Sequence, residues 1–187
     1  VTRVREGRMS RLESFPQDVA TIVGMEMAQL RILEQVFQVP LTTARLTFGY
    51  SIGELAALVL SGMFRLEDLL PVPLRLAADC AQLAGDVSMG VLFTRGPELP
   101  LKEVRHLCRK ISSRGDGLIG PSAYLAPNTA LILGQGNTLA HFEKQMGEVL
   151  PERSMLRRNP HRWPPLHTPL VWHRSVPNRV AVDLYRI

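Results

Sequence analysis

The stretch 46–59 constrains the fold of this chain more than any other part of its sequence. It predicts a short strand over 44–48, then a sharp turn and an almost wholly apolar helix. The turn carries Ser51 between Gly49 and Gly53. A serine in this Gly-x-Ser-x-Gly setting is typical of a nucleophile elbow. Because strand and helix must pass close together around such a turn, we expect a Cβ at either glycine to clash.

The predicted position of Ser51 suits it to attack a carbonyl carbon. At the start of a helix, free backbone N–H groups and the positive end of the helix dipole favour a developing oxyanion. The backbone N–H of Ile52, directly after the serine, is therefore an expected oxyanion donor. The same pattern also fits a plain glycine–serine turn, and this alternative stays open at this point.

Residues 49–68 resemble a known family of acyltransferases. They read Gly-Tyr-Ser-Ile-Gly-Glu, then an Ala-Ala-Leu-Val helix, a Ser-Gly turn and an acidic helix start. This is similar to the malonyl-CoA:acyl-carrier-protein transacylases and polyketide-synthase-type acyltransferases, except that Tyr50 stands where a histidine is usual. The resemblance implies an α/β fold, with a hydrolase-like acyltransferase core and an inserted ferredoxin-like subdomain.

A serine nucleophile needs a base that accepts its proton. The segment Leu166-His167-Thr168-Pro169-Leu170-Val171 resembles the family's Phe-His-Ser-Pro-Leu-Met, whose histidine is the general base. The resemblance implies a dyad of Ser51 and His167, in which a backbone carbonyl orients the imidazole. A structural role in the loop is the alternative for His167. Of the other histidines, His106 and His141 are expected on the surface, and His161 and His173 are the remaining candidate bases.

The sequence pattern of residues 89–159 differs from that of the rest of the chain and predicts the element order βαββαβ. Strands are predicted over 89–94, 118–125, 129–133 and 154–157, and helices over 101–112 and 138–149. This order is typical of a ferredoxin-like subdomain, which the resembled family inserts between its elbow and its catalytic histidine. The segment Gly134-Gln135-Gly136 predicts a hairpin or a strand-to-helix turn, and an oxyanion loop is the alternative.

We therefore predict three parts. Residues 1–18 form a loosely ordered lead-in, 19–88 and 160–187 form the core that carries Ser51 and His167, and 89–159 form the subdomain. The core is expected to contain the strand before the elbow and three further helical segments. These are a helix over 21–38 whose apolar face carries Met25, Ala28, Ile32 and Val36, a helix that opens at Leu66 and is interrupted by Pro71 and Pro73, and a helix over 74–84.

Composition limits the remaining classes of function. A hydrophobic content of 45% and a charged content of 21% are ordinary for a globular protein. No apolar run reaches the length of a membrane span, and residues 1–11 lack the apolar stretch of a secretory signal. The net charge of +5 is spread along the chain and aromatic residues make up only 6%, which argues against a nucleic-acid partner. Cys80 and Cys108 lack metal-ligand spacing and predict buried thiols in a reducing cytoplasm.

The resemblance implies the reaction. An acyl group of the malonyl type would pass from coenzyme A to Ser51 and then to the phosphopantetheine thiol of an acyl carrier protein, with no metal and no tightly bound cofactor. Family members that use malonyl-type substrates carry an arginine in the helix after the elbow, because a buried carboxylate needs a bidentate partner. Arg75 lies one place from that position, and pairing with Asp79 is its alternative role. The basic residues near 153–162 are a hypothetical docking surface for the carrier or for coenzyme A phosphates.

The resemblance covers roughly residues 20–172. The family's opening strand and its Phe-Pro-Gly-Gln-Gly loop, which supplies the second oxyanion donor, have no counterpart near Phe15-Pro16-Gln17. Two alternatives to the acyltransferase follow. One is a serine thioesterase or acyl hydrolase with a similar elbow, and the other is a truncated, non-catalytic member of the family.

Overall fold

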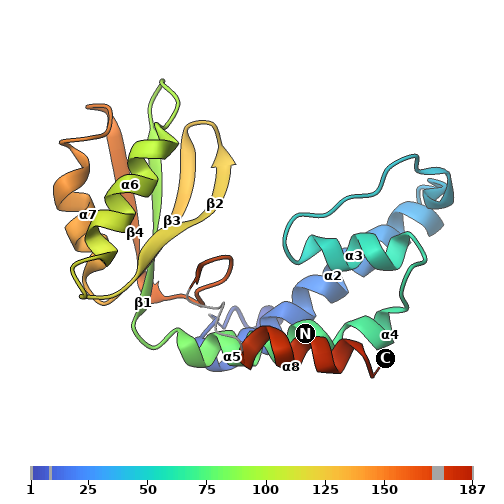
Figure 1. The fold of residues 1–187 in the computed structure, drawn as a ribbon. Helices are drawn as coiled ribbons and strands as arrows, with labels where there is room; N and C mark the ends of the chain where they lie inside the picture. Colours follow the sequence, from blue (N-terminus) through green and yellow to red (C-terminus); the bar gives the residue numbers. More distant parts are fainter. Residues whose placement is uncertain (1, 9, 170–174, 187) are drawn as a thin grey trace. The chain divides into compact units, whose positions relative to one another are not determined.

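The computed structural model describes residues 2–8, 10–169 and 175–186 (Figure 1). The chain divides into two compact units. Residues 1–78 and 177–187 form the first, here called the helical unit, and residues 79–176 form the second, the sheet unit. The predicted division was different, because it placed 79–88 and 160–176 with Ser51. Within these ranges, residues 87–88 begin β1 and residues 160–162 end β4, so both are part of the sheet.

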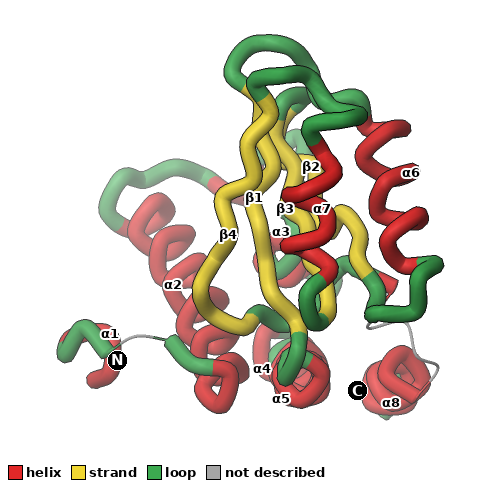
Figure 2. Tube along the Cα trace, turned by 90° about the vertical axis from the view of Figure 1, so that its left-hand side faces the viewer, coloured by secondary structure: helices red, strands yellow, loops and turns green. Residues whose placement is uncertain are grey.

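The sheet unit contains its elements in the predicted order. They are β1 (Val87–Thr94), α6 (Leu101–Ser112), β2 (Ile119–Ala126), β3 (Thr129–Gln135), α7 (Thr138–Met146) and β4 (Ser154–Arg162). The strands form one sheet in the order β2-β3-β1-β4, and every neighbouring pair is antiparallel. Figures 1 and 2 show α6 and α7 together over one face of this sheet.

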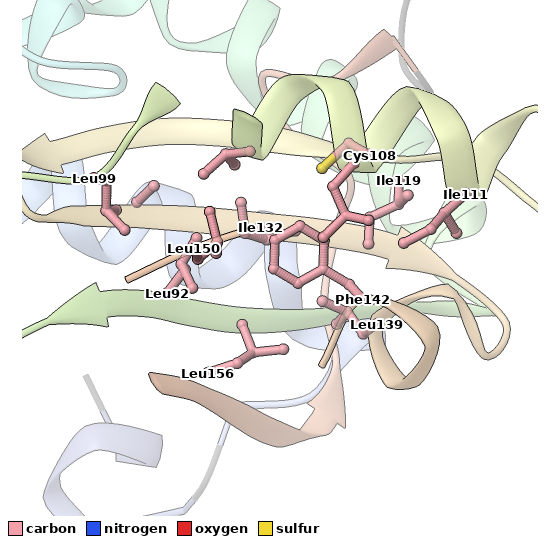
Figure 3. Packing of buried hydrophobic residues seen from close by; sticks show 13 residues of the cluster. Leu92, Leu99, Cys108, Ile111, Ile119, Ile132, Leu139, Phe142, Leu150 and Leu156 are labelled. Carbon is pink, nitrogen blue, oxygen red and sulfur yellow. The ribbon is translucent and has the colours of Figure 1, made fainter. Parts of the chain in front are cut away.

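The core of the sheet unit lies between these two helices and the sheet. Phe142 of α7 is fully buried at its centre, among side chains from α6 and all four strands (Figure 3). Helix α6 contributes a face at the spacing i, i+3, i+4, i+7, formed by Val104, Leu107, Cys108 and Ile111. This apolar stripe is the one that the sequence predicts, because an amphipathic helix buries the side chains that recur every 3.6 residues.

The helical unit consists of short and medium helices. They are α1 (Thr2–Arg5), η1 (Leu12–Ser14), α2 (Phe15–Gln35), η2 (Leu41–Thr43), α3 (Gly53–Leu60), α4 (Leu66–Leu69), most of α5 (Pro71–Leu83) and most of α8 (Ser175–Leu184). Prolines mark two helix starts that the sequence placed differently. Pro16 lies in the first turn of α2, and Pro71 and Pro73 lie in the first turn of α5. A proline is tolerated there because the first N–H groups of a helix have no intrahelical acceptor.

The predicted strand over 44–48 is wrong. The backbone groups of residues 45–49 form no hydrogen bond with any other described residue. Because a strand exists only as a member of a hydrogen-bonded ladder, this segment stays irregular. Its apolar side chains are open to solvent, with Leu46 77% and Phe48 83% exposed. All strands among the described residues belong to the sheet unit.

Helix α2 buries a different face from the predicted one. Met25, Ile32 and Val36 are exposed, whereas Val19 and Val23 are buried. The described part of the helical unit offers the predicted apolar stripe too few neighbours to cover it. The amphipathic pattern was thus correct for the helix, but its apolar face remains largely in solvent.

Both cysteines are buried free thiols, as predicted. Burial raises the pKa of Cys80 to about 11, with a smaller contribution from the charge of Asp79. Burial likewise raises the pKa of Cys108 to about 12. Separately, no helix in the described ranges is both long and apolar enough to cross a bilayer.

Replacing Phe142 should test the core of the sheet unit. Phe142→Ala should lower the free energy of unfolding by about 3–5 kcal/mol, because it leaves a cavity at a fully buried site. The matched control Phe48→Ala removes the same ring from a site that is 83% exposed, so we expect a change below about 0.5 kcal/mol. Urea denaturation followed by circular dichroism measures both. Equal losses in the two variants would contradict this packing.

The buried thiols should make the sheet unit sensitive to alkaline pH. An unfolded cysteine ionises near pH 9.0, whereas Cys80 and Cys108 in the folded unit ionise near 11 and 12. Between these values the unfolded chain has released protons that the folded chain keeps, so stability falls as pH rises above about 9. Cys80→Ala/Cys108→Ala should flatten this fall in denaturation curves. Native protein at about pH 8 should also resist iodoacetamide, since the thiolate is the reactive form.

Candidate active site

Ser51 lies in a tight turn that leads directly into α3. The Gly53 N–H donates to the Tyr50 carbonyl at 3.0 Å, and the Glu54 N–H donates to the Ser51 carbonyl at 3.0 Å. Ser51 itself has a φ of 55°, in the left-handed region that non-glycine residues rarely occupy. A strained turn at the head of a helix is one part of the strand–turn–helix geometry of a nucleophile elbow, and among the described residues no strand precedes this turn.

The two glycines around Ser51 have different roles. A Cβ added to Gly49 would overlap the backbone carbonyl of Gly53 and the backbone nitrogen of Glu54. Only glycine fits at position 49, as the sequence predicts. The expectation of a clash at Gly53 is wrong, because a Cβ there would meet only the Oε1 atom of Glu26, at 3.9 Å. A Cβ on Gly53 would project toward Glu26 of α2 and away from the turn.

The start of α3 offers a backbone donor beside the serine. Ile52 is half-buried and precedes Gly53, the first residue of α3. Its N–H has no acceptor among the described residues. Unsatisfied N–H groups at a helix start carry the positive end of the helix dipole. The geometry is therefore compatible with the predicted oxyanion donor.

Glu26 is a neighbour of the elbow that sequence reasoning missed. It lies on α2, one turn after the buried Val23, and its carboxylate faces Gly53 at the start of α3. Its Oε2 atom is enclosed and accepts no hydrogen bond from a described residue. In the sequence, Glu26 is marked only as a charged residue on the side of α2 that the structure buries.

His167 lies in an anchored turn of the sheet unit. The Thr168 hydroxyl, which is 1% exposed, donates to the Pro165 carbonyl at 2.6 Å. The Ser122 hydroxyl of β2 donates to the Leu166 carbonyl at 2.7 Å and so ties the turn to the sheet. The His167 side chain is exposed. The flanking residues therefore fix the backbone of the turn, while the imidazole reaches solvent.

Ser51 and His167 share an uncommon backbone conformation. In the described part of the chain, three non-glycine residues have a positive φ, namely Gln38 at 53°, Ser51 at 55° and His167 at 58°. Strained φ angles cluster at functional sites, where the surrounding structure enforces them. Two of the three fall on the residues that the sequence motifs predict as nucleophile and base. Ser51 belongs to the helical unit and His167 to the sheet unit.

Arg75 lies on α5 in the helical unit and is exposed. It lines a cavity of about 320 Å³ together with Arg179 of α8 and with Arg186, which follows that helix. This cavity concentrates positive charge that suits a carboxylate. Either predicted role of Arg75, as partner of a substrate carboxylate or of Asp79, remains a prediction.

The other histidines are distributed over the sheet unit. His106 on α6 and His161 on β4 are exposed. His141 on α7 differs from the expected surface position, because it is half-buried and its Nδ1 atom is enclosed with no hydrogen-bond partner among the described residues. It follows Thr138 by one turn and borders the core there. His173 lies outside the described residues.

The segment 134–136 forms a strand-to-helix turn, which confirms that prediction. Strand β3 ends at Gln135, and α7 begins at Thr138. Gly136 supplies the left-handed conformation that the turn requires, with a φ of 53°. Over the ranges that the structure describes, no group of three or more metal-ligating side chains lies together.

A cavity of about 950 Å³ lies beside His167 within the sheet unit. It is bounded by α6, by the start of β2 and by His167 and Pro169. Three basic residues of α6 line it, Lys102, Arg105 and Arg109. Sequence reasoning used α6 only for its apolar face and missed this basic row, although the spacing i, i+3, i+7 places the three on one side of a helix.

Comparisons with solved structures show which known fold this chain shares. No protein-family model and no curated protein sequence matches the chain. The solved malonyl CoA-acyl carrier protein transacylase from Coxiella burnetii has a TM-score of 0.74 at 19% identity, with 97% of this chain and 54% of that chain covered. The transacylase from Clostridium perfringens has a TM-score of 0.69 at 20% identity, with 94% and 51% covered.

A third solved structure is a type II polyketide-synthase acyl carrier protein in complex with its malonyl-transacylase. Its match has a TM-score of 0.67 at 16% identity, with 94% of this chain and 53% of that chain covered. The chain therefore has the fold of malonyl-CoA:acyl-carrier-protein transacylases, and it spans about half their length. The resemblance read from the elbow is thus confirmed for the α/β fold.

Alanine at the two glycines should give opposite results. Gly49→Ala should destabilise the helical unit by about 1–3 kcal/mol, because the added Cβ overlaps the first turn of α3. Gly53→Ala should be neutral or should stabilise by up to about 1 kcal/mol, because it enters open space on a helix. Thermal denaturation of the two variants measures the difference. A similar loss in both would argue against this turn.

Proposed function

We propose that this chain carries the nucleophile and base of an acyl-carrier-protein S-acyltransferase of the malonyl-transacylase type. The observation that carries the proposal is the strained turn at Ser51, closed by Gly49 and followed directly by α3. The fold likeness to malonyl-CoA:acyl-carrier-protein transacylases supports it.

The first half-reaction forms an acyl-enzyme. The Ser51 Oγ attacks the thioester carbonyl of an acyl-CoA, and Nε2 of His167 accepts the hydroxyl proton. The developing oxyanion takes the N–H of Ile52 as one of its donors. The C–S bond then breaks, and the coenzyme A thiolate leaves with the proton from His167.

The second half-reaction is the reverse with a different thiol. The phosphopantetheine thiol of an acyl carrier protein gives its proton to His167 and attacks the Ser51 ester. The C–O bond to Ser51 breaks, and the serine recovers its proton from His167. The proposed reaction uses no metal and no tightly bound cofactor, since the one acyl group stays covalently bound to sulfur or oxygen before and after each half-reaction.

Two groups of basic side chains suit the substrates. Arg75 is the proposed partner of the free carboxylate of a malonyl-type acyl group, because arginine binds a carboxylate through two parallel hydrogen bonds. The exposed arginines of 153–162 remain a proposed docking surface for the carrier. Within that surface Arg158 is ion-paired with Glu143 at 3.6 Å, which reduces its contribution.

The sheet unit is, in this proposal, the inserted ferredoxin-like subdomain of such an enzyme. Its element order and its strand order β2-β3-β1-β4 support that assignment. A cytoplasmic location is part of the proposal as well. It agrees with two cysteines that are free thiols.

A second candidate is a non-catalytic member of the family. The irregular segment 45–49 favours it, because an elbow held by an unpaired segment has less support than one held by a sheet. A serine thioesterase or acyl hydrolase is the third possibility. It would share the acyl-enzyme and differ only in using water as the acceptor.

Intact-protein mass spectrometry after incubation with malonyl-CoA or acetyl-CoA tests the proposal. We expect a malonyl adduct that disappears in Ser51→Ala, because only this serine has the elbow geometry. Ser61→Ala is the matched control, since it removes an exposed hydroxyl just after the same helix. It should keep the adduct.

Each outcome has a defined meaning. An acetyl adduct without a malonyl adduct would keep the mechanism and remove the proposed role of Arg75. Rapid loss of the adduct into water without any carrier would favour the hydrolase. The absence of any adduct on a folded protein would favour the non-catalytic member.

A further inference from the structure

The cavity beside His167 has no role in the proposed acyl transfer as described so far. Its volume of about 950 Å³ lies within the range of cofactor and substrate pockets. It belongs wholly to the sheet unit, whose internal arrangement the structure defines. One wall is the exposed side of α6, and His167 lies at another wall.

The charge of this cavity is positive, because three cationic side chains and one carboxylate line it among the described residues. Lys102, Arg105 and Arg109 line it, and none of them forms an ion pair within the described ranges. Among the described residues that line it, Glu103 is the one with an acidic side chain. Cations that outnumber the carboxylates in a concave site attract an anionic ligand.

The basic residues of β4 are different in this respect. Arg158 is ion-paired with Glu143, and the Arg162 guanidinium donates to the Asp86 carbonyl at 3.2 Å. Their charges are therefore partly engaged within the sheet unit. The α6 row is the better anion site, even though β4 carries the denser run of arginines in the sequence.

The side chain of Arg105 is held in place. Its Nε donates to the Leu101 carbonyl at 3.2 Å, and its Cζ lies 6.0 Å from the centre of the Tyr124 ring. These contacts leave the terminal N–H groups of the guanidinium available to a ligand. A planar guanidinium with two such N–H groups matches two oxygens of a phosphate.

We propose that this cavity binds the phosphate of a phosphopantetheine group, with Lys102, Arg105 and Arg109 as its cationic side. The choice of ligand rests on the proposed function. Both substrates of that reaction, coenzyme A and the loaded carrier, present pantetheine joined to a phosphate. The apolar part of the cavity, formed by Ile119, Pro121 and Val149, suits the uncharged pantetheine chain. His167 lies at the same cavity, so one ligand spans the cationic row and the base.

Calorimetric titration of the whole chain in a Ser51→Ala background tests this proposal without any acyl transfer. The probes are coenzyme A, 4′-phosphopantetheine and pantetheine. Arg105→Gln, Lys102→Gln and Arg109→Gln should each weaken coenzyme A binding by about tenfold, because each removes a charge-assisted contact. Lys110→Gln is the matched control, since it removes an exposed cation from the same helix outside the cavity lining.

The three probes separate the two sources of the phosphate. If 4′-phosphopantetheine shows the same dependence on Arg105, the site reads the phosphate that coenzyme A and the carrier share. If only coenzyme A shows it, the site is specific for coenzyme A. Pantetheine should be insensitive to all the substitutions. An equal loss in Lys110→Gln, or coenzyme A binding that no cavity substitution changes, would overturn the proposal.

The result is independent of the acylation experiment. Arg105-dependent binding of coenzyme A without acylation of Ser51 would keep the phosphate site and reject the acyltransferase. Acylation of Ser51 without Arg105-dependent binding of coenzyme A would keep the acyltransferase and reject the phosphate site.

Discussion

The close approach of Gly49 to the first turn of α3 is the constraint on which the candidate site depends. The chain reverses within three residues, so that no side chain fits between Gly49 and the backbone of residues 53–54. That reversal forces Ser51 to a φ of 55° and leaves the N–H of Ile52 at an open helix start. The positions of the proposed nucleophile and of the proposed oxyanion donor thus share one steric condition on the backbone.

The two units also differ in how far their extended segments are hydrogen-bonded. In the sheet unit each strand has a partner, and the paired strands expose one face that α6 and α7 cover with a fully buried core. In the helical unit the segment 45–49 has no partner, so its apolar side chains have no sheet face to join. Two stretches with similar apolar character therefore end in opposite environments.

This contrast explains which parts of the fold could be predicted from the sequence. The helix over 101–112 depends on its own periodicity and was predicted to the residue. A strand over 44–48 depends on a neighbour that the local sequence does not contain, and the prediction was wrong. The motifs placed Ser51 on an elbow, but Glu26 reaches Gly53 through the packing of α2 on α3, which periodicity alone does not give. The positive φ of His167 likewise depends on the anchors at Thr168 and Ser122.

Local compensation of charge, more than its density in the sequence, decides where this chain can receive an anion. The net charge of +5 is spread thinly, and two of the three arginines of β4 already engage a carboxylate and a backbone carbonyl. The row on α6 has three cations, as many as β4, and it faces a cavity and forms no ion pair among the described residues. Because His167 lies at that cavity, the side of the sheet unit that presents the base also presents the least neutralised positive charge. An anionic substrate attracted by that field would arrive beside the proposed base.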